Sequence, residues 1–104
     1  MENKYGISLY EFEREIQAFC PLGNDYYTCN IVVQFIPKNT IFDFCEIDNF
    51  IKSLGGANAI VEKLVNAVYF ELFKYDPDFL EVKGVAKSNT HFPVTVTKSS
   101  NYPF

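Results

Sequence analysis

The spacing of apolar residues changes along the chain from an alternating pattern to a helical one and back again, which restricts the fold more than any other feature. Ile31, Val33 and Phe35 alternate with more polar neighbours, as in a strand with one buried face. Residues 10–16 alternate less strictly. They favour a strand with one solvated face, although a helix with its apolar residues on one side stays an alternative.

The middle of the chain has a different period. Residues 44–54 and about 58–75 repeat apolar residues at three- and four-residue spacings, which is typical of a helix that packs on a core. Gly55-Gly56 is expected to end the first helix, and the second ends before Pro77, because proline does not readily continue a helix. The predicted elements are strands at 10–16 and 31–35, helices at 44–54 and 58–75, and strands at 80–83 and 92–97. This order predicts an α+β domain over residues 1–104, with a four-stranded antiparallel sheet and two helices on one face.

Length and composition limit the class of protein. The chain has 104 residues, enough for one domain with a core of its own. Its 48% hydrophobic and 17% aromatic content excludes intrinsic disorder. The N-terminal residues lack the pattern of a signal peptide, and no apolar run approaches the length of a membrane span. The expected location is the cytoplasm.

Cysteine count and charge exclude further classes. Three cysteines at uneven spacing do not form a complete disulfide framework, and a single histidine without a CxxC pair gives little support for a zinc site. The net charge of −4 argues against a protein coated with nucleic acid. A local basic patch for RNA remains open.

Four short stretches, in order, carry a resemblance to a known family. They are FCP at 19–21, FIP at 35–37, VEKLVNAV at 61–68 and DPDFLEVKG at 76–84. Together they resemble the tunnelling-fold family of the nitrile reductase QueF and its short QueF-like amidinotransferase relatives. The resemblance covers nearly the whole chain. It implies a tunnelling fold and a homo-oligomer with base sites between subunits, which the free edges of a four-stranded sheet would suit. The tail SSNYPF at 99–104 is expected to be a frayed end or to reach a neighbouring subunit.

The resemblance also implies a chemistry. Members of the family act on 7-cyano-7-deazaguanine, free or in tRNA, through a covalent thioimide, and Cys20 matches their nucleophile. A thiolate suits this step because it is the best side-chain nucleophile near neutral pH. Glu62 matches the glutamate that holds the guanine-like edge of the base, where a carboxylate accepts from the ring N–H and the exocyclic amine.

The sequence departs from the family pattern near both residues. The family has an aspartate seven residues after the cysteine, where this chain has Tyr27. Asp25 lies two residues earlier and is the candidate for the proton-transfer role if the loop is rearranged. Val61 stands where the family often has histidine. Tyr27 and His91 are further candidates for substrate contact, although the Tyr26-Tyr27 pair suits a strand on the core equally well.

The stretches that match the NADPH-binding parts of the reductases lack their cations. They read FDFCEIDNF at 42–50, which is acidic, and SNTHF at 88–92, which has no arginine. Asp43, Glu46 and Asp48 would repel an NADPH phosphate. The resemblance therefore favours the short branch, which needs no cofactor and makes archaeosine in tRNA by opening the thioimide with ammonia or another amine. An NADPH-dependent reductase of queuosine biosynthesis, and a non-catalytic protein that binds the deazapurine or only assembles, are the alternatives.

Each candidate residue also has an ordinary structural explanation. Cysteine is commonly a small buried hydrophobe, and Cys29, at the start of a strand, and Cys45, near an apolar helix face, are interpreted as packing residues. Glu62 suits the first turn of a helix through the helix dipole alone. A solitary histidine such as His91 is more often a surface or capping group than a catalytic base.

Overall fold

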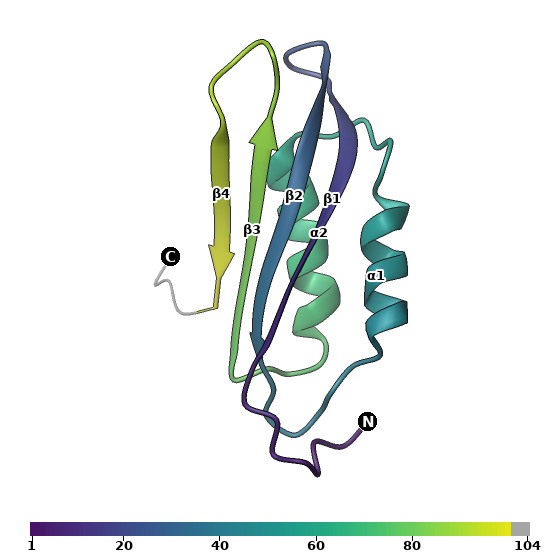
Figure 1. Ribbon diagram of the computed structural model, residues 1–104, viewed down its shortest axis with the longest axis vertical. Helices are drawn as coiled ribbons and strands as arrows, with labels where there is room; N and C mark the ends of the chain where they lie inside the picture. The colour runs from purple at the N-terminus through teal and green to yellow at the C-terminus, as the bar shows by residue number, and fades with distance from the viewer. Residues whose placement is uncertain (101–104) are drawn as a thin grey trace.

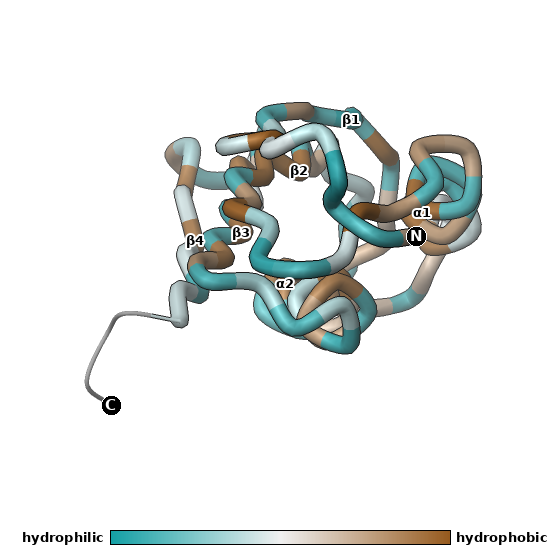
Figure 2. The backbone as a smooth tube through the Cα atoms, turned by 90° about the horizontal axis from the view of Figure 1, so that it is seen from below, coloured by the Kyte–Doolittle hydropathy of each residue, from teal (hydrophilic) through white to brown (hydrophobic). Residues whose placement is uncertain are grey.

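The computed structural model describes residues 1–100, which form a sheet of long strands and two helices (Figure 1). The elements are β1 (Tyr10–Cys20), β2 (Asp25–Ile36), α1 (Phe44–Ser53), α2 (Val61–Phe73), β3 (Phe79–Lys87) and β4 (Val94–Ser99). The strands pair antiparallel in the order β1-β2-β3-β4, so each strand lies beside its neighbours in sequence. Both helices lie on one side of the curved sheet (Figure 2). The expected α+β class and the ββααββ order are confirmed.

The core lies between α2 and the helix-facing side of the sheet. Along β2 every second residue from Tyr27 to Phe35 is buried, and Leu80 and Val82 of β3 are fully buried on the same side. Gly84 lies where α2 crosses β3. A Cβ added there would stand 2.6 Å from Val65 Cγ2 and 2.8 Å from Val61 Cγ2. Glycine therefore allows the first turn of α2 to approach the sheet backbone closely.

The first helix lies beside the edge strand β1, and an ion pair joins the two elements. Arg14 of β1 donates two hydrogen bonds of 2.7 Å to the Asp48 carboxylate of α1, and Lys52 lies 3.3 Å from the same carboxylate. Hydrogen bonding to Arg14 lowers the pKa of Asp48. Asp43 caps the helix by accepting from the backbone N–H groups of Cys45 and Glu46.

The element bounds differ from the sequence prediction mainly at one end of the molecule. The β1–β2 ladder continues to the pair Cys20 and Asp25, so β1 is four residues longer than predicted and β2 begins six residues earlier. Cys29 is therefore in the middle of a strand, and the prediction that it begins one is wrong. The helical alternative for residues 9–16 is also wrong, since β1 covers most of that segment.

The second helix begins at Val61, three residues later than predicted. The preceding residues cannot be helical because they pair with β1. Phe19 N–H donates to Ala57 O at 2.9 Å, and Ala59 N–H donates to Phe19 O at 3.0 Å. The third strand extends to Lys87, and β4 begins at Val94 instead of residue 92.

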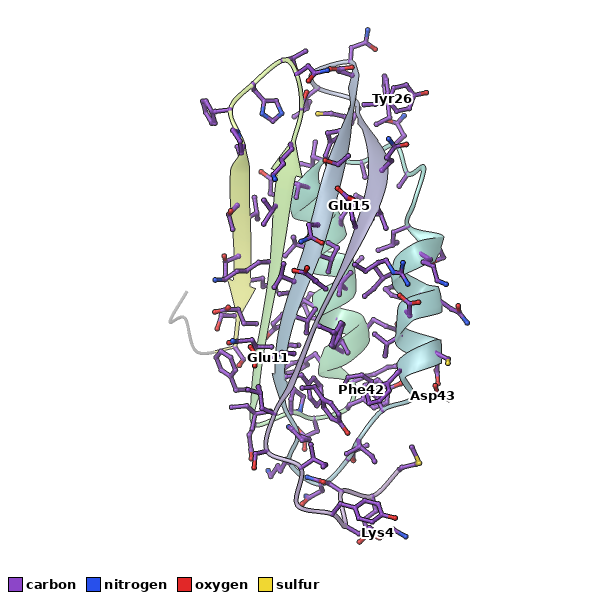
Figure 3. All side chains as sticks on the ribbon, viewed as in Figure 1. Lys4, Glu11, Glu15, Tyr26, Phe42 and Asp43 are labelled. Carbon is purple, nitrogen blue, oxygen red and sulfur yellow. The ribbon has the colours of Figure 1, made fainter. Side chains whose placement is uncertain are left out.

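Three connections meet at one end of the sheet, the upper end in Figure 1. They are the β1–β2 turn at residues 21–24, the β3–β4 loop at 88–93 and the α1–α2 connection at 54–60. We call this region the hairpin end. Tyr26 lies there, whereas Phe42 and Asp43 lie near the opposite end (Figure 3). No helix within residues 1–100 is long and apolar enough to cross a membrane. The end of the predicted tail, residues 101–104, lies outside the described residues.

Candidate functional site

Cys20 and Asp25 face each other at the hairpin end. They are directly opposite in the β1–β2 register, separated by the four-residue turn of Pro21 to Asn24. Directly opposed residues of an antiparallel pair lie on the same face, with Cβ atoms about 4.5–5.5 Å apart. The sequence suggested that Asp25 needs a rearranged loop to reach the cysteine. The strand register already places the two residues opposite each other.

The turn also supplies a donor to the thiol. Gly23 N–H donates to Cys20 Sγ at 3.4 Å, and Asn24 N–H donates to Cys20 O at 2.8 Å. Asn24 has a φ of 54°, a left-handed conformation that asparagine tolerates better than most residues. Cys20 is half-buried, so its sulfur lies at the boundary between core and solvent.

The other cysteines lack this combination. Cys29 is completely buried, and burial raises the pKa of its thiol to about 11, which keeps it protonated near neutral pH. It is a packing residue, as expected. Cys45 is exposed on α1, so the expectation that it packs on the core is wrong. It lies in the first turn of that helix, next to the cap residue Asp43 and far from the hairpin end.

Tyr27 connects the sheet to the α1–α2 connection. Its hydroxyl donates to Ala59 O at 2.5 Å, and the residue is only 6% exposed. Burial raises the pKa of Tyr27, and nearby Cys29, Cys20 and Glu62 raise it further. In the strand register Tyr27 pairs with Ala18, two residues before Cys20 on the same face of the sheet.

Glu62 stands in the first turn of α2 and is exposed. The α1–α2 connection, through its backbone pairing with Phe19 and the hydrogen bond from Tyr27, brings this helix start beside the end of β1. No side chain caps α2, whose cap residue is Ile60. The carboxylate of Glu62 is therefore available at a helix N-terminus, where a negative charge is stabilised by the helix dipole.

The two neighbouring tyrosines point to opposite faces of the sheet. Tyr26 is 69% exposed, and its ring packs edge-on against Phe19 at a centroid distance of 5.1 Å. The exposed ring is the one that can stack on a flat base, whereas Tyr27 contributes a wall inside the fold. Tyr26 shares its face of the sheet with Phe19, whereas Tyr27 shares its face with Cys20 and Asp25.

Asp25 is anchored to the β3–β4 loop. Its Oδ2 accepts from Ser88 Oγ at 3.3 Å, and its Oδ1 accepts from the backbone N–H of Tyr26 at 2.8 Å. Ser88 Oγ also lies 2.9 Å from Thr90 Oγ1. A hollow of about 380 Å³ opens beside this carboxylate, bordered by polar side chains that include Gln17, Thr28, Lys87 and Asn89.

His91 does not join the other candidates through any contact. It is exposed in the β3–β4 loop, three residues before β4, and its Nδ1 lies 2.6 Å from the carbonyl of Phe92. The prediction that it stands at a strand start is therefore wrong. Within residues 1–100, no three histidine, cysteine, aspartate or glutamate side chains gather in a way that would hold a metal ion.

Comparison with known proteins gives a fold relative. No protein-family model and no curated protein matches the sequence. Among solved structures, the crystal structure of the archaeosine synthase QueF-Like in the apo form is similar, with a TM-score of 0.82 and 18% sequence identity. The match covers 92% of this chain and 96% of that one. The chain has the fold of this synthase.

The shared fold extends over nearly the whole of both chains. The synthase has the strand and helix order that the sequence resemblance predicted. At this level of identity the similarity concerns the fold, and the roles of individual residues have to be argued from the site itself.

Two residues of the site were not identified from the sequence. Gly23 donates to the Cys20 sulfur, and Ser88 contacts Asp25 from the β3–β4 loop, 63 residues away in the sequence. The sequence does contain a signal for Gly23, because this glycine lies in a turn close to the cysteine. It contains no such signal for Ser88, because the contact of Ser88 with Asp25 depends on how far β2 and β3 extend beside each other.

Proposed function

We propose that this protein is a QueF-like amidinotransferase that converts 7-cyano-7-deazaguanine in tRNA to archaeosine through a thioimide on Cys20. The observation that carries the proposal is the pairing of Cys20 with Asp25 across the β1–β2 turn, beside the helix start that bears Glu62. A half-buried thiol, a carboxylate opposite it and a second carboxylate nearby are the groups that this chemistry requires. The fold shared with an archaeosine synthase supports the same reading.

In the first step, the Cys20 sulfur adds to the nitrile carbon. Asp25 accepts the thiol proton and delivers it to the nitrile nitrogen, so that one C–S bond and one N–H bond replace the S–H bond and one C–N π bond. The N–H of Gly23 stabilises negative charge on the sulfur before the attack.

In the second step, ammonia or another amine adds to the thioimide carbon. The tetrahedral adduct loses a proton and then breaks its C–S bond, and the sulfur leaves as a thiolate that regains the proton. The net reaction with ammonia adds NH₃ across the nitrile and gives the amidine. No electrons are transferred, so this route needs no nicotinamide cofactor.

Glu62 is proposed to select the base. Its carboxylate accepts from the ring N–H and the exocyclic amine of a guanine-like edge. Tyr27 is buried and its hydroxyl is bonded to Ala59 O, just before the helix that carries Glu62.

The acidic side chains at 42–50 have structural roles, and the cations paired with them are not free to bind an NADPH phosphate. Asp43 caps α1, and Asp48 pairs with Arg14 and Lys52. The basic side chains of Arg14 and Lys52 beside this region are paired with Asp48. This argues for the amidinotransferase over the reductase.

A homo-oligomer is part of the proposal. Within residues 1–100, β1 and β4 are the two edges of the sheet and pair with one neighbour each. Edges of this kind accept a strand from another copy. A ring of such sheets would bring further residues to the hairpin end.

The test compares intact masses after incubation with 7-cyano-7-deazaguanine under non-reducing conditions. The parent protein and a Cys45→Ala control are expected to gain the mass of one base, whereas Cys20→Ala gains nothing. Nitrile-bearing tRNA and labelled ammonia should then yield labelled amidine with the parent alone. No adduct on folded parent with either the free base or the tRNA would refute the proposal. Oxidation of NADPH in the presence of the base would replace it with the reductase.

A further inference from the structure

We propose that Ser88 is a positioning residue that fixes the orientation of the Asp25 carboxylate at the hairpin end, an inference that rests on the proposed function. Asp25 stands at the first position of β2, where the backbone alone does not fix its side-chain rotamer. Its two oxygens have separate donors, the backbone N–H of Tyr26 for Oδ1 and the hydroxyl of Ser88 for Oδ2. A carboxylate with a donor on each oxygen has one preferred orientation.

The donor on Oδ2 comes from a different part of the chain and is itself supported. Ser88 is half-buried directly after β3, and its Oγ accepts from Thr90 N–H at 3.2 Å. The Thr90 hydroxyl lies 2.9 Å from the same oxygen, and either group can be the donor. The β3–β4 loop therefore turns back on itself so that its first hydroxyl faces the β1–β2 hairpin.

The choice of a hydroxyl suits a carboxyl group that changes protonation during a reaction. While Asp25 is ionised, Ser88 donates to it and accepts from Thr90. Once Asp25 has taken the thiol proton, Ser88 accepts from the acid and donates to Thr90 Oγ1 instead. Rotation of two hydroxyl groups serves both states without movement of the backbone. An amide or an ammonium side chain at residue 88 has no single atom that can both donate and accept a hydrogen bond.

The direct test measures the side-chain rotamer of Asp25 by NMR. Three-bond couplings to its Hβ atoms report χ1 in the parent, Ser88→Ala and Ser88→Thr proteins. We expect a single rotamer in the parent and in Ser88→Thr, which keeps the hydroxyl, and rotamer averaging in Ser88→Ala. The matched control is Ser53→Ala, because Ser53 donates to a backbone carbonyl of α1 and should not affect Asp25. A single unchanged rotamer in Ser88→Ala would overturn the inference.

The second measurement concerns the reaction. Ser88→Ala should form the thioimide with 7-cyano-7-deazaguanine roughly ten-fold more slowly, the size expected from one hydrogen bond to a charged group. Binding of the base, compared between Cys20→Ala and the Cys20→Ala/Ser88→Ala double variant, should not change. An unchanged rate, or a loss of binding equal to the loss of rate, would overturn the positioning role. If the parent forms no adduct, the proposed function fails, and the couplings still decide the role of Ser88.

Discussion

In a β-strand, adjacent side chains point to opposite faces, and this gives the two tyrosines at the start of β2 different environments. Tyr26 faces solvent, and Tyr27 is buried with its hydroxyl bonded to the Ala59 carbonyl. That single bond fixes the residues immediately before α2, and with them the start of the helix that carries Glu62. A side chain inside the fold can therefore control the geometry of an exposed carboxylate.

Replacement of Tyr27 by phenylalanine should destabilise the fold modestly. The ring stays in place, but the Ala59 carbonyl loses its donor in a buried position, at a cost of about 1–2 kcal/mol in the free energy of unfolding. Urea denaturation of the two proteins measures the difference. Tyr26→Phe is the matched control and should change stability by less than about 0.5 kcal/mol, because that residue is exposed. Equal effects of the two variants would show that the bond to Ala59 contributes nothing.

At this scale the sequence suggested candidate residues but not how they lie relative to one another. Cys20 and Asp25 were identified from a resemblance that expects the acid at the position of Tyr27. The strand register decides which of the two faces the thiol, and register depends on pairing between strands. The hydroxyl of Ser88 was missed for a similar reason, since its contact with Asp25 joins residues 63 positions apart.

Among the secondary-structure elements, the hairpin β1–β2 and the start of α2 form one unit. The connection at 54–60 runs beside the end of β1, where Phe19 exchanges two backbone hydrogen bonds with Ala57 and Ala59. Further along the sheet, the valine side chains of α2 lie close to β3 because Gly84 has no side chain. The start of α2 therefore contacts the sheet at two places.

Alanine at Gly84 should disturb this contact. Its Cβ would stand 2.6 Å from Val65 Cγ2 and 2.8 Å from Val61 Cγ2, and both valines are stiff β-branched residues. We expect a loss of about 1–3 kcal/mol in the free energy of unfolding, as for other overpacked cores. Denaturant unfolding checks this, with Gly23→Ala as the control, because a Cβ there would lie at an ordinary 3.8 Å from Cys20 Sγ. A Gly84→Ala protein as stable as the control would show that α2 can move away freely.

The sequence predicted the type and order of all six elements correctly, because the periods of β2, α1 and α2 are strong local signals. It failed at the element ends near the site. The alternation in residues 17–20 and 25–30 includes small, polar and sulfur-containing residues that give a weak local pattern. Those segments are strands because they pair with each other, and residues 58–60 are not helical because they pair with β1. Long-range pairing of this kind has no local signature in a single sequence.

For the whole molecule, the net charge is −4, but the basic side chains differ in whether they have a partner. Arg14, Lys52, Lys74 and Lys83 form ion pairs with carboxylates. Within residues 1–100, the side chains of Lys38, Lys63 and Lys87 form no ion pair, hydrogen bond or contact with an aromatic ring. Lys63 stands next to Glu62 in the first turn of α2, and Lys87 borders the hollow beside Asp25. Two of the three uncompensated lysines therefore lie at the hairpin end.

If the substrate is tRNA, these two lysines should contact its phosphates. Lys63→Ala and Lys87→Ala should each weaken tRNA binding and reduce the slope of log affinity against log salt by about 1, the change expected for one lost phosphate contact. Fluorescence anisotropy with labelled tRNA over a series of salt concentrations measures both quantities.

Lys38→Ala is the matched control, because Lys38 is also exposed and unpaired but follows β2 at the opposite end. The free base carries no phosphate, so its binding should be the same in all three variants. An effect of Lys38→Ala as large as that of the other two would place the RNA elsewhere on the molecule. Unchanged slopes in every variant would instead favour the free base as the substrate.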